Sequence, residues 1–548
     1  MLSPGRFVCG VELVSTRGSI AEQRARETRE MAGELLQCDF IDWMSITDNA
    51  GGNPQLSPLA LGKPILYGGK EVIIHLSCKD FNRNGLESQA WQLESEGFHN
   101  ILALSGDYPI AGYRGASKSV FDIDSVALLT MLSEMNRGMD VRSRGAGTGR
   151  TLQQTRFLLG AVGTNFKKYE SEVIPQYLKL RKKLEAGAQF IICQIGYDAR
   201  KSHEMKLYLD HNGYRDVPLI GNVFLLNARV AEVFRSGRIP GVVVSDQLYE
   251  QCRRWGDAPG KGRAFFIELA AKQVAIFRGL GYRGVYMGGV DEAGDLTDIW
   301  NLANTFAADD WKQFARELSY SRPGEFFLYE RDSTSGLSDP HQLNREYLKS
   351  LEHRKPSHNV TLGYRLSKWM HDRVFTPGSA MFNLGRRIYG RAKDTRQGPL
   401  PLRVLEHASK AAMFSCKDCG DCSLPEIAFS CPESACAKNQ RNGPCGGTRD
   451  GKCEVFDFEC IWSIAYDRLK YEGREQQMLD YEPVIQDQSL RGTSSWANTF
   501  LCRDHHSRVQ AQTQPETSPC PTPPPQHPLQ IVQEQELEPI GPSRSSES

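Results

Sequence analysis

Eight of the fifteen cysteines in this 548-residue chain lie within one short stretch, residues 416–460. Thiolates at two-residue intervals can surround one metal centre. The CxxCxxC start of this stretch is more typical of iron–sulfur ligation than of a zinc finger, whose pairs are separated by a long loop. Eight ligands also suffice for two four-thiolate sites, and zinc could hold together a segment this poor in apolar residues. The predicted metal ligands are Cys416, Cys419, Cys422, Cys431, Cys436, Cys445, Cys453 and Cys460.

A second set of chemically capable residues lies in or just after apolar runs of the first 200 residues. Glu12 interrupts the run VCGVELV, and an apolar environment raises the pKa of a carboxyl group, which prepares it to act as a general acid. Each of the others also has an ordinary structural explanation, such as a core histidine, a helix N-cap or a buried amide. These others are Thr47, His75, Asp107 and Gln194.

The elements that must position these residues alternate in type over the first 300 residues. Apolar, β-branched runs predict strands, and apolar residues at spacings of three and four predict helices at 19–36, 86–97, 125–135 and 177–187. The segment 228–283 favours a helix pair rather than a further strand. Eight strands with intervening helices predict an α/β fold, a (β/α)8 TIM barrel, with a doubly wound open sheet as the alternative. The predicted strands are 7–14, 40–47, 72–78, 100–106, 156–163, 190–196, 218–224 and 284–288.

Composition and charge exclude several classes of protein. Lys plus Arg equals Asp plus Glu at 66 each, so no overall field favours nucleic acid or an anionic membrane surface. No stretch approaches the roughly 18 apolar residues that cross a bilayer, and the N-terminus lacks the pattern of a signal peptide. We therefore expect a cytoplasmic, reducing location, where clustered cysteines bind metal more often than they form disulfides.

Several of these motifs, taken in order, resemble those of the methylenetetrahydrofolate reductase family over approximately residues 5–300. The resemblance implies a barrel that holds FAD in its mouth. The flavin would be reduced by NADH or NADPH and would pass hydride to 5,10-methylenetetrahydrofolate, giving 5-methyltetrahydrofolate. The motifs are VELVSTRGS, MSITDNAGG, IIHLSCKD, HNILALSGDYP and YLKLRKKLEAGAQFIICQIGYD.

The resemblance also implies roles for individual residues. Glu12 stands at the position of the general acid that protonates the folate N10, Asp107 at the aspartate near flavin and pterin, and Gln194 at a pterin-contacting glutamine. The chain departs from the family pattern where an arginine is replaced by Ser105, a tyrosine by Gly163 and an aspartate by Gln176. The positions assigned to FAD are Thr47, His75, Ser105, Gly106, Asp107 and Lys183.

The remainder of the chain is expected to form three further parts after a barrel of residues 1–315. Residues 316–364 predict a connector with short helices, and the Pro-, Gln- and Glu-rich residues 506–548 predict a disordered tail. Residues 365–505 resemble the cysteine-rich domain that accompanies some bacterial members of the family. This implies an iron–sulfur cluster or zinc and a link to a redox partner protein. A basic stretch around Arg386 and Arg391 is either a solvated helix or a docking surface for an acidic partner.

Three alternatives to the reductase remain at this point. They are an electron-transfer or partner-docking component of a reductase complex, a reductase that acts on a related pterin carrier, and a non-catalytic scaffold or methyl-transfer partner that keeps the barrel without turnover. The sequence does not decide whether the reducing cosubstrate is NADH or NADPH. It also leaves open whether the protein is a monomer or a homo-oligomer.

Overall fold

The structure is a computed structural model that describes residues 5–142 and 149–506. The predicted disordered tail, 506–548, lies outside the described residues except for His506. Within the described part, no helix is both long and apolar enough to span a bilayer.

Eight parallel strands close into a barrel, which confirms the predicted fold and rules out the open sheet. The order around the barrel is β1-β10-β9-β8-β7-β4-β3-β2. Each barrel strand therefore pairs with the barrel strands before and after it along the chain, and β10 pairs with β1 to close the barrel. All eight predicted strands are present within a few residues of their expected bounds. They are β1 Val8–Leu13, β2 Trp43–Ile46, β3 Glu71–Ser77, β4 Asn100–Leu104, β7 Leu158–Gly163, β8 Phe190–Cys193, β9 Leu219–Phe224 and β10 Gly284–Gly288.

Helices cover the outside of the barrel, and the segment 228–283 contains three of them where a pair was expected. That prediction was wrong because Ser245 begins an additional helix, its hydroxyl accepting a hydrogen bond from the backbone N–H of Leu248. The barrel helices are α1 Gln23–Leu36, α2 Pro58–Tyr67, α3 Arg83–Ser95, α4 Ser125–Arg137, α5 Glu170–Glu185, α6 Ala199–His211, α7 Ala228–Arg235, α8 Asp246–Gly256, α9 Arg263–Gly279 and α10 Ala293–Thr305, with short 3-10 turns at Ala50–Gly52 and Pro259–Gly262 and a hairpin of β5 Asp140–Arg142 and β6 Gly149–Thr151.

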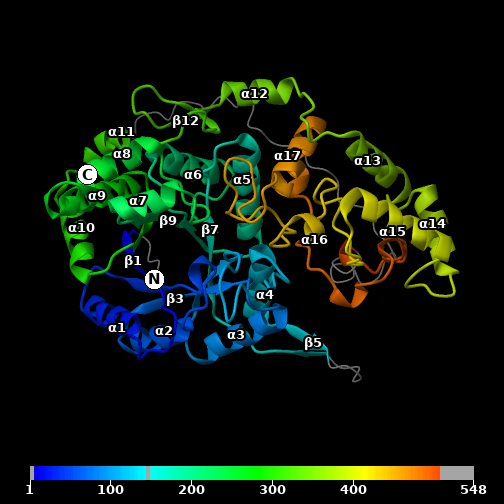
Figure 1. Cartoon of the computed structure of the whole chain (residues 1–548), viewed down its shortest axis with the longest axis horizontal. Helices are drawn as coiled ribbons and strands as arrows, with labels where there is room; N and C mark the ends of the chain where they lie inside the picture. The colour runs from blue at the N-terminus through cyan, green and yellow to red at the C-terminus, as the bar shows by residue number, and fades with distance from the viewer. Residues whose placement is uncertain (1–4, 143–148, 507–548) are drawn as a thin grey trace, which may run out of the picture.

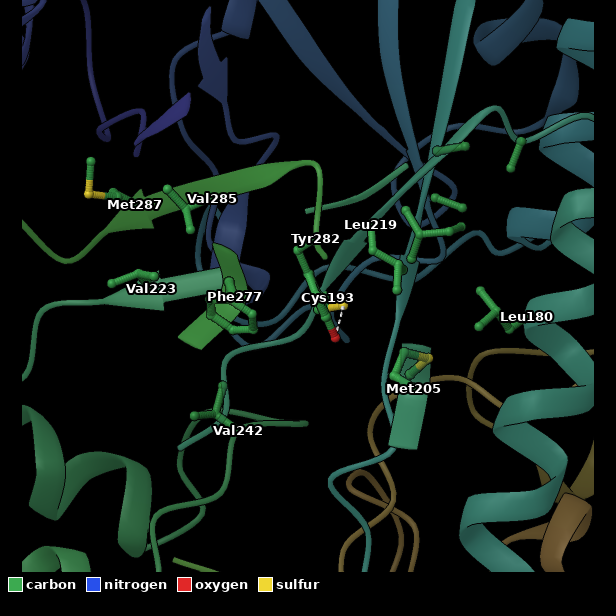
Figure 2. Packing of buried hydrophobic residues seen from close by; sticks show 14 of the residues in the cluster. Leu180, Cys193, Met205, Leu219, Val223, Val242, Phe277, Tyr282, Val285 and Met287 are labelled. Atoms are coloured by element: carbon green, nitrogen blue, oxygen red, sulfur yellow. Dashed lines mark hydrogen bonds between the residues drawn. The ribbon is translucent and has the colours of Figure 1, made fainter. Parts of the chain in front are cut away.

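Large side chains fill the interior of the barrel, so a ligand can approach only at its ends. Trp43 is fully buried, and a Cβ at Gly10 on the neighbouring strand would lie 2.0 Å from its ring. The outward faces of the strands pack against the helices, as Figure 2 shows for Cys193, Met205 and Tyr282. The interior cluster consists of Val8, Trp43, Ile73, Leu102, Phe190, Ile192, Ile220 and Tyr286.

The connector contains a hairpin as well as the expected short helices. The strands β11 Tyr329–Arg331 and β12 Ser338–Leu343 pair antiparallel between α11 Asp310–Glu317 and α12 Arg345–Glu352. Glu204 of α6 is buried and accepts hydrogen bonds from the backbone N–H groups of Leu328 and Tyr329. The connector is therefore fixed to the barrel wall.

The C-terminal part lies beside the barrel, with α17 next to α5 (Figure 1). Its outer helices α13 to α15 carry exposed apolar side chains, including Trp369, Leu384 and Leu400. The elements are α13 Leu362–Val374, α14 Ala380–Gly390, α15 Leu400–Phe414, α16 Pro432–Ala435, α17 Ile461–Glu472 and α18 Ser495–Phe500, with 3-10 turns at Glu475–Met478 and Gln488–Leu490.

Candidate active site and metal centres

A polar layer containing Glu12 lies above the apolar interior, towards the carboxyl ends of the strands. Tyr286 of β10 donates a hydrogen bond from its hydroxyl to Glu12 Oε2 at 3.0 Å, and the same hydroxyl lies 3.5 Å from His75 Nε2. Ser45 Oγ is 2.7 Å from that same imidazole nitrogen. Four neighbouring strands, β10, β1, β2 and β3, therefore contribute to one hydrogen-bonded cluster.

The electrostatic environment of this cluster favours uncharged side chains. Burial raises the pKa of Glu12, and the hydrogen bond from Tyr286 opposes this only in part. Burial also lowers the pKa of His75 to about 4, so the imidazole is neutral at pH 7. The other Glu12 oxygen, Oε1, faces Gly288, where a Cβ would lie at 3.4 Å. The glycine leaves space beside the oxygen that can carry the acidic proton.

Asp107 follows β4 and holds the loop after β2. Its Oδ2 accepts a hydrogen bond from the backbone N–H of Gly51 at 2.7 Å. A side chain at Gly52 is excluded, because φ is +73° and a Cβ would lie 2.2 Å from the backbone oxygen of Tyr108. The NAGG sequence thus lets two loops meet at the barrel mouth, where Asp107 remains partly exposed.

Of the remaining predicted site residues, Thr47 and Gln194 directly follow strands and Lys183 lies on helix α5, and all three make contacts of their own. Thr47 is buried, and its Oγ1 accepts from the backbone N–H of Ser15. Lys183 on α5 donates to the backbone oxygen of Val162 at 2.6 Å, and burial lowers the pKa of its amine to about 7. Gln194 Oε1 accepts from the N–H of Ile195. The contacts found for these three do not include Glu12 or Asp107.

Residues 438–448, here called the docking loop, reach from the C-terminal part to the barrel mouth. Ser105 Oγ donates to Gln440 Oε1 at 3.0 Å, and Lys438 Nζ donates to the backbone oxygen of Gly106 at 2.8 Å. Both barrel residues were assigned to FAD by resemblance. Their polar groups are therefore engaged by protein in this conformation.

Helix α5 and the loop before it also bind the docking loop, in addition to the contacts of Ser105 and Gly106. Gln176, where the family pattern has an aspartate, donates to the backbone oxygen of Cys445 at 2.7 Å. Lys179 donates to Gln440 and to the backbone oxygen of Gly443, and Lys167 donates to that of Gly446. A departure from the family pattern thus coincides with an interdomain contact.

A buried ion pair joins Lys438, the first residue of the docking loop, to Glu454. Burial opposes the charge on the amine, but Glu454 and then Cys445 and Asp107 raise the pKa of Lys438 above its usual value. The two side chains are 5% and 7% exposed. The ammonium group of Lys438 therefore lies close enough to Asp107 to interact with its charge.

Replacing Lys438 with Met should destabilise the protein by about 3–5 kcal/mol, because a buried carboxylate would lose its partner. Chemical denaturation followed by tryptophan fluorescence measures the change. Lys452→Met is the matched control, since the Lys452–Asp457 pair is exposed and its loss should not shift the transition. Equal shifts in the two variants would contradict the assignment.

The eight cysteines form two groups of four. The first quartet, Cys416, Cys419, Cys422 and Cys431, lines a single small cleft together with Lys410 and Phe414. In the second quartet, Cys436 lies close to Cys445 and Cys453, and Cys460 lies close to Cys436 and Cys445. The single turn of α16, about 6 Å long, separates Cys431 from Cys436. The second quartet includes Cys445 of the docking loop, so it is the one next to the barrel.

The spacing within the quartets bears on which metal they suit. Four thiolates around one zinc ion at 2.3 Å lie roughly 3.8 Å apart. Within the described residues, no three cysteine sulfurs lie within 4.8 Å of one another. Backbone N–H groups of Asp418, Gln440 and Val455 point at cysteine sulfurs at 3.4–3.5 Å, a contact that tunes iron–sulfur clusters. These three N–H groups hold the sulfurs of Cys416, Cys436 and Cys453 in place.

Three features of the site were missed in the sequence. Tyr286 could have been found from GVYMG, where it is the inward-facing polar residue of the eighth strand. Ser45 has a similar place in the second strand. The docking loop carries no local signal, because its partners are more than 250 residues away along the chain.

Comparison with known proteins gives two family matches. Residues 22–292 match the family described as Methylenetetrahydrofolate reductase, and residues 401–488 match the one described as Methylene-tetrahydrofolate reductase C terminal.

Two solved structures are among those similar to this chain. An uncharacterized protein from Clostridium thermocellum that binds two copies of 5-methyl-5,6,7,8-tetrahydrofolic acid is 12% identical, with a TM-score of 0.38, over 55% of this chain and 94% of that one. The Yersinia pestis dihydropteroate synthase in a sulfonamide drug complex is 9% identical, with a TM-score of 0.31, over 56% and 95%. At these scores neither likeness bears on ligand or activity.

Proposed function

Since the chain belongs to the methylenetetrahydrofolate reductase family, we propose that it reduces 5,10-methylenetetrahydrofolate to 5-methyltetrahydrofolate with NAD(P)H. In this reaction the bond between the bridging carbon and N10 breaks, N10 gains a proton, and the carbon gains a hydride. The protein must therefore supply an acid and a site that favours the cationic iminium formed when the ring opens.

The observation that carries this proposal is the environment of Glu12. Burial raises its pKa and so favours the protonated carboxyl, Tyr286 fixes one of its oxygens, and Gly288 leaves room beside the other. Glu12 is thus a general acid that donates its proton to the departing nitrogen. Asp107, a carboxylate at the same mouth, would stabilise the positive charge on the iminium. Gln194 would contact the pterin.

The residues assigned to FAD fit that cofactor only in part. Thr47, His75 and Asp107 lie at or near the carboxyl ends of β2, β3 and β4, where a bound flavin would supply the hydride, whereas Lys183 lies on α5 and is bonded to the backbone oxygen of Val162. Ser105 and Gly106 are hydrogen-bonded to the docking loop, so the polar contacts assigned to them require this loop to move. The chain's own acid and carboxylate are unaffected by this difference.

The test is anaerobic reduction of the purified full-length protein. We expect bound flavin, bleaching of its visible absorption on addition of NADH or NADPH, and return of the colour on addition of 5,10-methylenetetrahydrofolate. Reduction that the folate substrate fails to reverse would exclude the proposed function. If the protein reduces the folate substrate without any bound flavin, the proposed reaction would stand but FAD would not be its cofactor.

A second function, electron transfer, is favoured by the placement of the cysteine quartets. The second quartet borders the barrel mouth through Cys445, and the first lies beside α15. Apolar side chains on the outer surface of α13 to α15 are exposed, among them Leu362 at 84% and Trp369 at 60%. A redox partner that docks there could deliver electrons through the two centres towards the barrel.

Iron and acid-labile sulfide analysis of anaerobically purified protein tests this function. About four iron and four sulfide per quartet, together with reduction by a low-potential one-electron donor, support electron transfer. Zinc with sulfur neighbours and no sulfide would make the quartets structural and would exclude this route.

A further inference from the structure

Glu426, His505 and His506 bring three ligand atoms together outside the cysteine quartets. These atoms all lie within 4.8 Å of one another. Glu426 Oε1 is 2.7 Å from His506 Nε2 and 3.5 Å from His505 Nε2. The ligands of a tetrahedral metal ion bound through N and O at about 2.05 Å lie roughly 3.3 Å apart. The observed separations bracket this value.

Two atoms of the group are buried without a hydrogen-bond partner among the described residues. They are Glu426 Oε2 and His505 Nε2. The side chains of Glu426 and His505 are only 4% and 8% exposed. A buried carboxylate oxygen and a buried imidazole nitrogen left unpaired both carry a cost in free energy, which a bound cation would remove.

Asp421 orients one of the two imidazoles from behind. His505 Nδ1 lies 2.6 Å from Asp421 Oδ1, and the backbone N–H of His505 donates to the same oxygen. When a carboxylate accepts a hydrogen bond from Nδ1–H of a neutral imidazole, the lone pair of the ring is on Nε2. Metal-bound histidines are commonly oriented by a carboxylate in this way. The Nε2 lone pair of His505 then points towards Glu426.

The second imidazole completes the group and leaves it open to solvent on one side. The rings of His505 and His506 are tilted by 35° with 4.1 Å between centroids, a separation at which two positive charges would repel each other. The side chain of His506 is 47% exposed, so a water molecule can reach a fourth coordination position.

We propose that Glu426, His505 and His506 bind one Zn²⁺ ion in a site separate from the cysteine quartets. Two imidazoles and one carboxylate form a donor set that zinc accepts with water as its fourth ligand. The ion ties the last described residues of the chain to the loop between Cys422 and Cys431. This assignment is independent of the reaction that the barrel performs.

Zinc X-ray absorption and elemental analysis of the full-length protein test the proposal. We expect about one zinc per chain with only nitrogen and oxygen in its first shell. The His506→Asn variant should lose this equivalent while its iron and sulfide content stays unchanged. His506 is half-exposed, so this variant should fold. Glu426→Gln, which preserves side-chain volume, should give the same loss.

His353→Asn is the matched control, because His353 is 79% exposed and lies on the connector. It should retain the full zinc content. Zinc that has only sulfur neighbours and is fully retained in His506→Asn, an equal zinc content in all variants, or protein without zinc would each overturn the assignment. The last result would leave a network of ion pairs between the two histidines and their carboxylates. Iron lost from His506→Asn in place of zinc would also overturn it.

Discussion

Replacing Glu12 with Gln should lower the rate of 5,10-methylenetetrahydrofolate reduction by about 10²–10⁴-fold, the usual contribution of a general acid. Glutamine has nearly the same shape and can still accept the hydrogen bond from Tyr286, but it has no acidic proton to give to N10. Stopped-flow measurement of flavin reoxidation by the folate substrate reports this step directly.

The preceding half-reaction provides an internal control for this variant. Reduction of bound flavin by NAD(P)H needs no proton for a leaving nitrogen, so its rate should survive the substitution. Glu27→Gln, on the exposed face of α1, should leave both rates unchanged. Parallel loss of both half-reactions in Glu12→Gln would indicate a damaged barrel and would contradict the role of Glu12 as the acid.

The pH dependence of the folate half-reaction should follow the same carboxyl group. Glu12 is active in its protonated form, and burial raises its pKa. The rate should therefore be constant at low pH and fall as pH rises through that raised pKa. Tyr286→Phe removes a hydrogen bond that stabilises the carboxylate, so its profile should shift to higher pH. An unchanged profile would exclude Tyr286 as the residue that positions Glu12.

If each quartet holds its own metal centre, as proposed, replacing Cys436 with Ser should abolish one centre and detach the docking loop from the barrel. Structural metal sites contribute on the order of 10–16 kcal/mol of binding free energy in small domains, which a segment this poor in apolar residues cannot replace. We expect the metal content to fall by about half. Limited proteolysis should then cleave within 438–448, where the wild-type protein is protected.

Cys38→Ser is the control for this experiment, because Cys38 lies near the end of α1 and belongs to neither quartet. Its metal content and proteolysis pattern should match those of the wild-type protein. Complete loss of metal in Cys436→Ser would show that the eight cysteines serve a single centre, and full retention would show that Cys436 is not a ligand.

The sequence was sufficient to predict the eight strands because buried parallel strands leave a strong local signal, an apolar β-branched run such as VIIHLS. It also singled out Glu12, since a carboxylate within such a run is unusual. The partner of Glu12 could not be found in this way, because Tyr286 lies 274 residues away and reaches it only when the barrel closes. Local patterns do not encode such contacts.

The cysteines show the same division between local and distant information. The CxxCxxC spacing predicts that Cys416, Cys419 and Cys422 share a centre. Nothing in the spacing determines that Cys431 joins them while Cys436 turns to the other side. The turn of α16 makes that separation, and a four-residue helix that begins with proline leaves too weak a signal in the sequence.

The order of the two halves along the chain has a consequence for how a cofactor enters. The last barrel strand ends at Gly288, and the docking loop begins 150 residues later, at Lys438. Because domains emerging from the ribosome fold from the N-terminus, the barrel is complete while Ser105 and Gly106 are still uncovered. A dinucleotide present at this stage would find the barrel mouth open. A dinucleotide added to the finished protein could reach Ser105 and Gly106 only after the docking loop had moved away.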